Sequence, residues 1–343
     1  MIDINSLVRK NIQELTPYAS AREQFLGKAS IYLDANENPF LNGLNRYPDP
    51  QQKELKNLIS FRNKVAPNQI VLGNGSDELL DLIMRVFCEP ATDNIIITPP
   101  TFGIYKVLAN ANNVEVKEAP LTNDFELDTN VILGLVNDKT KIIFICSPNN
   151  PTGNLIDINS IKKLLPLNCI IVIDEAYIDF TKQESWISSL PTNPNLIILQ
   201  TFSKAWAMAG IRIGMSFSSP EIAQNINKVR LPYNVNLLSQ QKAVAAFENT
   251  SIISENLQAI KDEKQDLWQS LNSLSVVVKV YPSDANFFLV KFRKAKEVYT
   301  QLAQKGIVVR DFSRTKGCEE CLRISVGTPE ENKSLIGYLK INK

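Results

Sequence analysis

Strand-like and helix-like segments alternate along the first part of the chain. Short runs of β-branched residues are separated by stretches in which apolar residues recur at helical spacing. We expect strands at Gln69–Leu72, Asn94–Thr98, Val114–Lys117, Lys141–Cys146, Cys169–Asp174, Asn195–Thr201 and Ile211–Phe217. Helices are expected to begin near Ser76, Gly103, Asp157 and Glu221. This alternation is typical of an α/β fold with a mostly parallel central sheet flanked by helices.

A second pattern begins after about residue 236. Two long helical stretches come first, and further helices then alternate with expected strands at Val276–Val280, Asn286–Phe292, Ile307–Arg310 and Leu322–Val326. This part indicates a smaller α/β domain. We therefore expect a large domain over residues 41–245, and a small domain made of residues 246–343 together with the N-terminal segment, residues 1–40.

Neither a membrane segment nor a secretory signal is expected. Apolar runs such as Lys141–Cys146 are much shorter than the ~20 residues of a membrane helix, and the N-terminus lacks a signal-like apolar stretch. Five scattered cysteines do not suggest a disulfide framework and favour reduced thiols in the cytoplasm. Cys318 and Cys321 form a C-x-x-C pattern, but without a second pair or histidines it does not indicate a zinc or redox site.

Charge and composition narrow the possible chemistry. Lys and Arg together number 37 against 36 Asp and Glu, so no global field attracts nucleic acid or an anionic membrane. The chain contains no histidine, which excludes Ser-His-Asp and Cys-His catalytic units and a histidine zinc site. No cluster of carboxylates or cysteines suggests another metal site. A reaction here must use other groups.

Glycine is scarce, at 13 of 343 residues, and several glycines fall beside candidate ligand-binding loops. An expected strand ends in the Gly73–Gly75 turn, and Ser76 is the expected N-cap of the helix that follows. Backbone N–H groups at such a turn can hold a phosphate. The segment is also compatible with an ordinary tight turn, and Asp77 and Glu78 would repel a phosphate if they faced it.

Two other loops follow buried strands. The segment S-P-N-N-P-T-G, residues 147–153, presents amide side chains at a strand end, although it also suits an ordinary turn. Asp174 and Glu175 come directly after an apolar run. Because an unpaired buried carboxylate is costly, we expect a partner cation, with a helix cap or a salt bridge as the alternative.

Lys204 is the most informative residue, because it follows an apolar strand and lies between Phe202 and Trp206. Desolvation lowers the pKa of a lysine and makes its amine a usable nucleophile. Thr201, Ser203 and Arg212 are suited to holding a phosphate beside that amine. A lysine for a Schiff base, a phosphate cradle, a buried aspartate and an aromatic ring face together indicate a pyridoxal 5'-phosphate site.

A series of motifs resembles the histidinol-phosphate aminotransferases, which are fold type I pyridoxal-phosphate enzymes. Between residues 32 and 328 the chain contains, in order, YLDANENPF, NRYPDP, GNGSDE, PPTFGIY, SPNNPTG, DEAYIDF, TFSKAWAMAGIRIG, GIVVRD and CLRISVGT. SPNNPTG, DEAY and the lysine segment are shared by many aminotransferases. The NENP, NRYPDP and GIVVRD segments narrow the resemblance to this subgroup and its close relatives.

The resemblance implies roles for individual residues. Lys204 resembles the Schiff-base lysine and proton carrier, Asp174 the partner of the pyridine nitrogen, and Tyr177 and Asn150 the groups that bind the 3'-oxygen. Phe102 would stack on the ring, where many relatives have tyrosine. The residues expected around the phosphate are Gly75, Ser76, Asp77, Thr201, Ser203 and Arg212.

The substrate and the partner subunit are implied in the same way. Tyr47 would reach the phosphate of the other subunit, which makes the expected active unit a homodimer. Arg323 resembles the arginine that binds the carboxylate of glutamate. Arg310 and Tyr18 would contact the phosphate of histidinol phosphate, and Asn150 and Tyr47 also border the substrate. Alternatively, the two arginines are ordinary salt-bridge partners and Tyr18 packs in the core.

The activity that the resemblance implies is transamination between L-histidinol phosphate and 2-oxoglutarate in histidine biosynthesis. One alternative is an aromatic or broad-specificity amino-acid aminotransferase, and another is a phosphothreonine decarboxylase of the same fold. A fourth possibility is a binding protein that retains the cofactor, and the presence of Lys204 argues against it.

Overall fold

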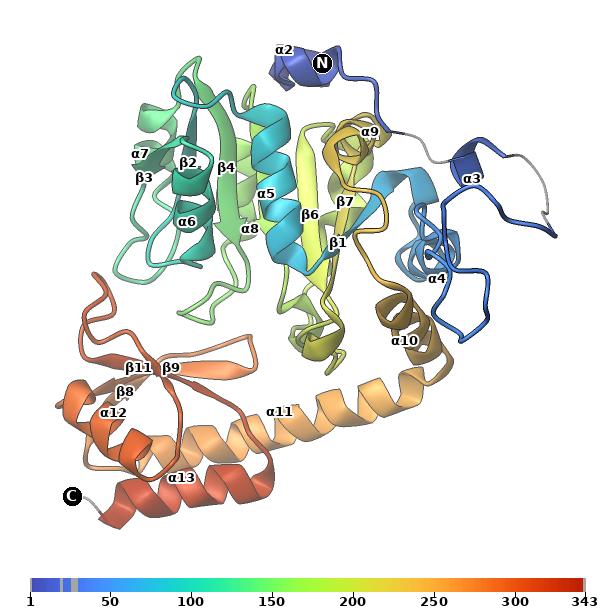
Figure 1. The fold of residues 1–343 in the computed structure, drawn as a ribbon. Helices are drawn as coiled ribbons and strands as arrows, with labels where there is room; N and C mark the ends of the chain where they lie inside the picture. The colour runs from blue at the N-terminus through green and yellow to red at the C-terminus, as the bar shows by residue number, and fades with distance from the viewer. Residues whose placement is uncertain (1, 19–20, 26–29, 342–343) are drawn as a thin grey trace.

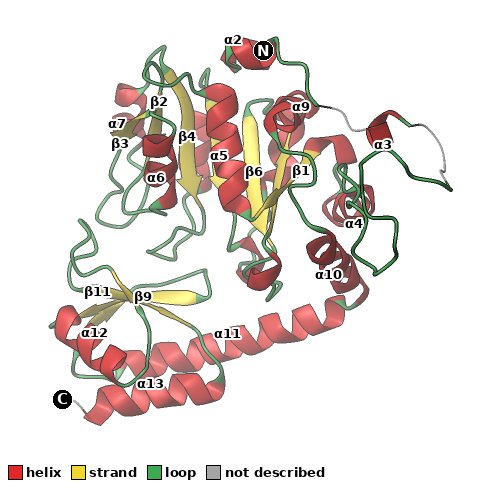
Figure 2. Ribbon diagram, in the orientation of Figure 1, coloured by secondary structure: helices red, strands yellow, loops and turns green. Residues whose placement is uncertain are grey.

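The computed structural model describes residues 2–18, 21–25 and 30–341. A large sheet has helices on both faces, and a smaller sheet packs against its own helices (Figures 1 and 2). The predicted α/β class is therefore confirmed. No helix within these ranges is long and apolar enough to cross a membrane.

Seven strands form the large sheet. They are β1 (Ile70–Asn74), β2 (Asn94–Ile97), β3 (Glu115–Glu118), β4 (Thr140–Cys146), β5 (Ile170–Asp174), β6 (Leu196–Thr201) and β7 (Ile213–Ser218). Their order is β1-β7-β6-β5-β4-β2-β3. The strands from β3 to β6 in this order are parallel, and β7 is antiparallel to both of its neighbours. The predicted strands agree with these bounds to within a few residues.

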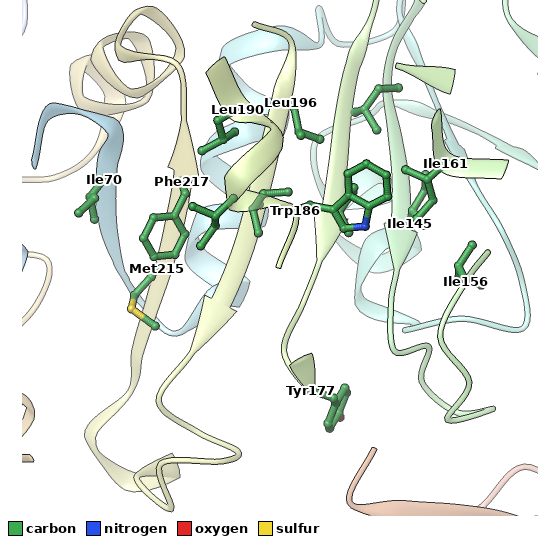
Figure 3. Close-up of a cluster of buried hydrophobic side chains, with 14 of the residues drawn as sticks. Ile70, Ile145, Ile156, Ile161, Tyr177, Trp186, Leu190, Leu196, Met215 and Phe217 are labelled. Carbon is green, nitrogen blue, oxygen red and sulfur yellow. The ribbon is translucent and has the colours of Figure 1, made fainter. Parts of the chain in front are cut away.

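Nearly every residue of the central strands is apolar because both faces of the sheet are buried. In β5, Ile170 and Val172 join one core cluster, while Ile171 and Ile173 join the other. The first cluster lies under α5 (Ser76–Phe87), α6 (Ile104–Ala111) and α9 (Pro220–Val229). The second is covered by α4 (Lys53–Asn63), α7 (Thr129–Leu135), α8 (Ile158–Leu164), α10 (Leu237–Glu248) and the 3-10 helix η3 (Trp186–Thr192). Part of this second cluster is drawn in Figure 3.

The smaller sheet is antiparallel throughout. Its strands are β8 (Val277–Val280), β9 (Phe287–Phe292), β10 (Arg310–Asp311) and β11 (Cys321–Ser325), in the order β10-β11-β9-β8. Helices α11 (Thr250–Asn272), α12 (Ala295–Gln304) and α13 (Pro329–Ile341) share its core. The 23-residue α11 is about 34 Å long at 1.5 Å per residue, and it runs from the end of α10 to the small sheet (Figure 1).

The first turns of the N-terminal segment pack against the large sheet's helices. Its helices are α1 (Ile4–Leu7), α2 (Lys10–Gln13) and α3 (Ala21–Gln24). Ile4 and Leu7 belong to the core cluster under α5 and α9, the Arg9 amide donates to the Val86 carbonyl, and Lys228 donates to the Ile12 carbonyl. The first turns of the chain thus lie against the large domain, whereas the prediction from the sequence assigned residues 1–40 to the small domain. The division at residue 245 stays a prediction.

Local differences from the predicted pattern have physical causes. Of the expected strand Ile307–Arg310 only Arg310 pairs with β11, together with the next residue, Asp311, and the exposed Val308 side chain gains nothing from the sheet. Helices α4 and α7 were not predicted. Ser76 is the first residue of α5 rather than its N-cap, because Gly75 occupies the cap position with φ +81°. The remaining short 3-10 helices are η1 (Pro67–Gln69), η2 (Ile178–Phe180) and η4 (Ala209–Ile211).

Glu175, just beyond β5, ties the sheet to η3. Its buried carboxylate accepts hydrogen bonds from Ser185 Oγ (2.5 Å), the Trp186 amide (2.8 Å) and Gln200 Nε2 (2.9 Å). Burial raises the pKa of Glu175 to about 7, although these donors oppose the change. The carboxyl therefore ionises at higher pH in the folded protein than in the unfolded chain.

Glu175→Gln should remove part of the pH dependence of stability. Because the folded-state pKa is raised, ionising Glu175 lowers the free energy of unfolding as pH rises from about 4.5 to about 7, by on the order of 3 kcal/mol. Urea unfolding of both proteins at pH 5 and pH 8 measures this. The variant should lose less stability than the wild type, and the exposed Glu184→Gln is the matched control. Equal losses in wild type and Glu175→Gln would contradict the assignment.

Candidate active site

The candidate residues converge at the carboxyl edge of the parallel strands. Asn150 lies in the loop after β4, Asp174 is the last residue of β5, and Lys204 lies in the turn after β6. These three strands are adjacent and parallel, so their carboxyl ends meet at one edge of the sheet, where open α/β proteins bind ligands.

Asp174 is enclosed by protein, with only 3% of its surface exposed. Its Oδ2 accepts a hydrogen bond from the Tyr105 hydroxyl at 2.7 Å, and its Oδ1 accepts one from the Ala176 amide at 3.1 Å. Burial raises the pKa of Asp174, and these two donors and the charge of Lys204 oppose it. No lysine or arginine of the described ranges forms an ion pair with Asp174, and a hydroxyl and a backbone amide hold its carboxylate.

Tyr105 was missed in the sequence analysis. Its ring stacks on Phe144 (centroids 4.9 Å apart, planes at 8°) and meets the edge of Phe102 (5.7 Å, 86°). Its hydroxyl needs an internal partner because the residue is fully buried. A tyrosine on the apolar face of α6 was the available signal, but periodicity alone did not identify its acceptor.

The Lys204 side chain is accessible, yet protein atoms surround much of it. Desolvation lowers the pKa of Lys204, and the positive charge of Arg323 acts in the same direction. The ammonium lies 5.5 Å from the centroid of the Tyr177 ring. Asp174 attracts the charged form and limits the decrease in pKa. The arrangement makes the neutral amine more available than in a lysine on the open surface.

An anion cradle surrounds the start of α5. A Cβ added to Gly75 would lie 2.4 Å from Arg212 Nη2, and one added to Gly214 would lie 2.3 Å from the Ser76 nitrogen. This close approach leaves the first N–H groups of α5 beside the Arg212 guanidinium. The hydroxyls of Thr201 and Ser203 are 3.0 Å apart on the neighbouring turn.

The two acidic residues at the start of α5 have other partners. Asp77 forms an ion pair with Arg212 at 3.6 Å. Glu78 turns back, where its carboxylate accepts hydrogen bonds from the Asn74 amide and from Asn234 Nδ2. These contacts reduce the repulsion that the two carboxylates would exert on a phosphate bound at the start of α5.

Two further aromatic residues, Tyr177 and Phe102, belong to the predicted site. Tyr177 is buried, with its ring edge-on to Phe287 at 5.2 Å. Burial raises the pKa of Tyr177, so its hydroxyl stays protonated and can donate a hydrogen bond. Figure 3 shows Tyr177 at the edge of the apolar cluster, apart from Trp186 and its neighbours. Phe102 is half-buried beside Tyr105.

Arg323 joins the small sheet to this edge. Its Nη1 donates to Asn150 Oδ1, and its guanidinium lies 5.2 Å from the Phe287 ring centroid. Its buried Nε has no hydrogen-bond partner, so one N–H is free to bind an anion. Burial lowers the pKa of Arg323, and Arg310, opposite it in the β10–β11 register, adds to this effect. Neither arginine forms an ion pair with another described residue.

Tyr18 and Tyr47 lie in the N-terminal part of the chain. Tyr18 is 73% exposed, so it does not pack in the core. Tyr47 is 51% exposed and stacks on Tyr233, with ring centroids 4.5 Å apart. Over the described residues, neither tyrosine forms a hydrogen bond with Lys204 or Asp174. The same residues contain no group of three or more metal-binding side chains.

Comparison with known proteins identifies the family. The model for aminotransferase class I and II matches residues 34–339. A histidinol-phosphate aminotransferase from Flavobacterium psychrophilum is 52% identical over 341 residues, covering 98% of each chain. This chain belongs to the histidinol-phosphate aminotransferases. The resemblance identified from the motifs is thus confirmed.

Two solved structures bear on the fold and on the alternatives. The histidinol-phosphate aminotransferase of Sinorhizobium meliloti, in complex with pyridoxal-5'-phosphate, is 25% identical with a TM-score of 0.79 and covers 86% of this chain and 82% of its own. The L-threonine-O-3-phosphate decarboxylase of Porphyromonas gingivalis is 26% identical with a TM-score of 0.73, covering 87% and 93%. Fold similarity therefore extends to both enzyme classes.

Tyr105→Phe should destabilise the cofactor-free aminotransferase in a pH-dependent way. Asp174 has a raised folded-state pKa, so its ionisation costs stability as pH rises, and the Tyr105 hydroxyl offsets part of that cost only while Asp174 is charged. We expect a loss of about 1.5–3 kcal/mol when Asp174 is ionised and a smaller one when it is protonated. Urea unfolding over a series of pH values that spans the titration of Asp174 measures both values.

Tyr299→Phe, in α12 of the small domain, is the matched control and should show no such pH dependence. If Tyr105→Phe lost the same stability across the whole pH series, the hydroxyl would not be supporting the charged form of Asp174.

Proposed function

We propose that this enzyme transfers the amino group between L-histidinol phosphate and 2-oxoglutarate, giving imidazole-acetol phosphate and glutamate in histidine biosynthesis. The observation that carries the proposal is the convergence of the Lys204 amine, the buried Asp174 carboxylate and the α5 anion cradle at one sheet edge. The names and the extent of identity of the relatives support this substrate.

The residues present fit pyridoxal 5'-phosphate. The N–H groups at the start of α5, with Thr201, Ser203 and Arg212, offer donors suited to its phosphate. Asp174 is a buried acceptor for the protonated ring nitrogen, and Phe102 offers an apolar face. When bound, this cofactor supplies an electron sink for the negative charge that develops at the substrate α-carbon.

Lys204 holds and moves the proton in this scheme. Its lowered pKa favours the neutral amine, which would accept a proton from the substrate α-carbon and would return it at C4′ of the bound cofactor. Asp174, whose carboxylate accepts two hydrogen bonds, would pair with the ring nitrogen and favour its protonated form. Tyr177 and Asn150 would orient the ring by donating to its 3'-oxygen.

Arginine can bind either anionic substrate. Arg323 offers an unpartnered Nε–H and a guanidinium flanked by aromatic rings, which suits the carboxylate of glutamate. Arg310 is exposed beside it and, with Tyr18, would contact the phosphate of histidinol phosphate. A guanidinium serves carboxylate and phosphate alike, so one pocket accommodates both half-reactions.

The active unit in this proposal is a cytoplasmic homodimer in which Tyr47 serves the other subunit's phosphate site. Ile31, Leu33, Phe40 and Leu41 are each more than three-quarters exposed, which is unusual for neighbouring apolar residues on a monomer. A second copy that covers this segment would bury them. All five cysteines are free thiols, in keeping with a reducing compartment.

A single-turnover absorbance experiment tests the proposed activity. Loaded wild-type protein should show a cofactor band that depends on Lys204, and adding histidinol phosphate without a keto acid should convert it to the pyridoxamine form. Lys204→Ala should abolish the conversion, while the exposed Lys182→Ala should retain it. Response to phenylalanine but not to histidinol phosphate would support the broad aminotransferase. Release of carbon dioxide from phosphothreonine would support the decarboxylase.

Arg323→Gln should affect substrate binding more than cofactor binding. Loss of the buried guanidinium that faces a carboxylate should raise KM for glutamate by about 30-fold or more. The cofactor dissociation constant should change by less than KM, because Arg323 lies on the small sheet and reaches the cofactor site only through Asn150 and Lys204. Steady-state kinetics and a cofactor titration separate these effects, with the exposed Arg314→Gln as control. An unchanged KM would overturn the role of Arg323.

A further inference from the structure

Tyr47 is held from several sides although half of its surface is exposed. Its backbone N–H donates to Glu37 Oε1 at 2.6 Å, and its carbonyl accepts a hydrogen bond from Arg22 Nη1 at 3.3 Å. Its ring stacks on Tyr233 with an angle of 17° between the planes. The backbone and the ring of one surface residue are thus restrained separately.

Glu37 is the centre of this network. Its side chain is only 3% exposed, and besides the Tyr47 amide it accepts hydrogen bonds from Arg46 Nη1 (2.8 Å) and from Arg22 Nη2. Burial alone would raise the pKa of Glu37, but the three donors outweigh it and lower the pKa to about 2. The carboxylate is therefore charged at every pH at which the enzyme works.

The network restrains the segment that presents the Tyr47 hydroxyl. The Glu37 carboxylate joins the guanidinium groups of Arg22 and Arg46 to the Tyr47 backbone. Arg22 also forms an ion pair with Asp34. Removing the Glu37 carboxylate from water costs free energy. An exposed tyrosine such as Tyr47 does not need this network in order to stay soluble. Fixing a donor before it meets an anion reduces the entropy lost on binding.

We infer that Glu37 is a positioning residue for Tyr47, holding the phenol of one subunit in place to donate to the cofactor phosphate of the other. This inference rests on the proposed function, in which Tyr47 acts across the dimer. Glu37 contacts neither cofactor nor substrate in this account, and it acts only through the Tyr47 backbone.

A double-mutant cycle on the cofactor dissociation constant tests the inference. Equilibrium titration of apoenzyme with pyridoxal 5'-phosphate, followed by fluorescence, gives the constant without reference to turnover. Tyr47→Phe should weaken binding about 10-fold, as expected for the loss of one hydrogen bond to a charged phosphate. Glu37→Gln should weaken it several-fold in the wild type, and by less than about twofold in the Tyr47→Phe background, because the two residues act as one unit.

Mixed dimers show which subunit's Glu37 affects cofactor binding at a given site. Co-expressed subunits are purified as heterodimers in which one subunit carries Lys204→Ala and so has no Schiff-base lysine. Glu37→Gln placed on that subunit should weaken cofactor binding at the intact Lys204 of the other. The same substitution on the Lys204-bearing subunit should leave that site's affinity unchanged. A general loss of structure would not follow this pattern.

One control and one alternative variant accompany this test. The exposed Glu54→Gln, at the start of α4, should bind the cofactor normally. If Glu37→Gln does not fold, Glu37→Asp keeps the charge facing both arginines while withdrawing the carboxylate from the Tyr47 amide, and it should give the same non-additive loss.

The outcomes separate the two claims. If Tyr47→Phe leaves cofactor affinity unchanged, the proposed role of Tyr47 fails. If Tyr47→Phe weakens binding but the Glu37 variants have no effect, have an additive effect, or act in the same subunit, the inference about Glu37 is wrong while the role of Tyr47 stands.

Discussion

The site is organised around a carboxylate that must stay charged while protein encloses it. Asp174 lies at the end of a fully buried strand, where burial favours its protonated form. Two donors from different parts of the chain, the Tyr105 hydroxyl and the Ala176 amide, compensate for the lost water. A cationic ring nitrogen bound beside this carboxylate would be held strongly, because little solvent screens the pair.

The other charges of the site come from two neighbouring elements. Lys204 follows the neighbouring strand and responds to both Asp174 and Arg323, which shift its pKa in opposite directions. Arg323 reaches the same edge from the small sheet through Asn150. One side of the site is therefore supplied by the large sheet and the other by the small one, which allows substrate binding to couple the two parts.

The sequence was sufficient for residues whose spacing is local. Thr201, Ser203, Lys204 and Arg212 lie within one segment, and an apolar run ending in Asp174 predicts a carboxylate at a strand end. Tyr105 is 69 residues from Asp174, and only the packing of α6 on the sheet brings them together. The role of Glu37 could likewise not be predicted from the sequence, because it depends on a turn that brings its carboxylate to the Tyr47 backbone.

The protonation state of the ring nitrogen tests the central claim most directly. Enzyme loaded with pyridoxal 5'-phosphate labelled with 15N in the ring reports this state through its nitrogen chemical shift. At pH 8 the account predicts a protonated nitrogen in the wild type and an unprotonated one in Asp174→Asn. An unprotonated nitrogen in the wild type, or a shift unaffected by Asp174→Asn, would contradict it.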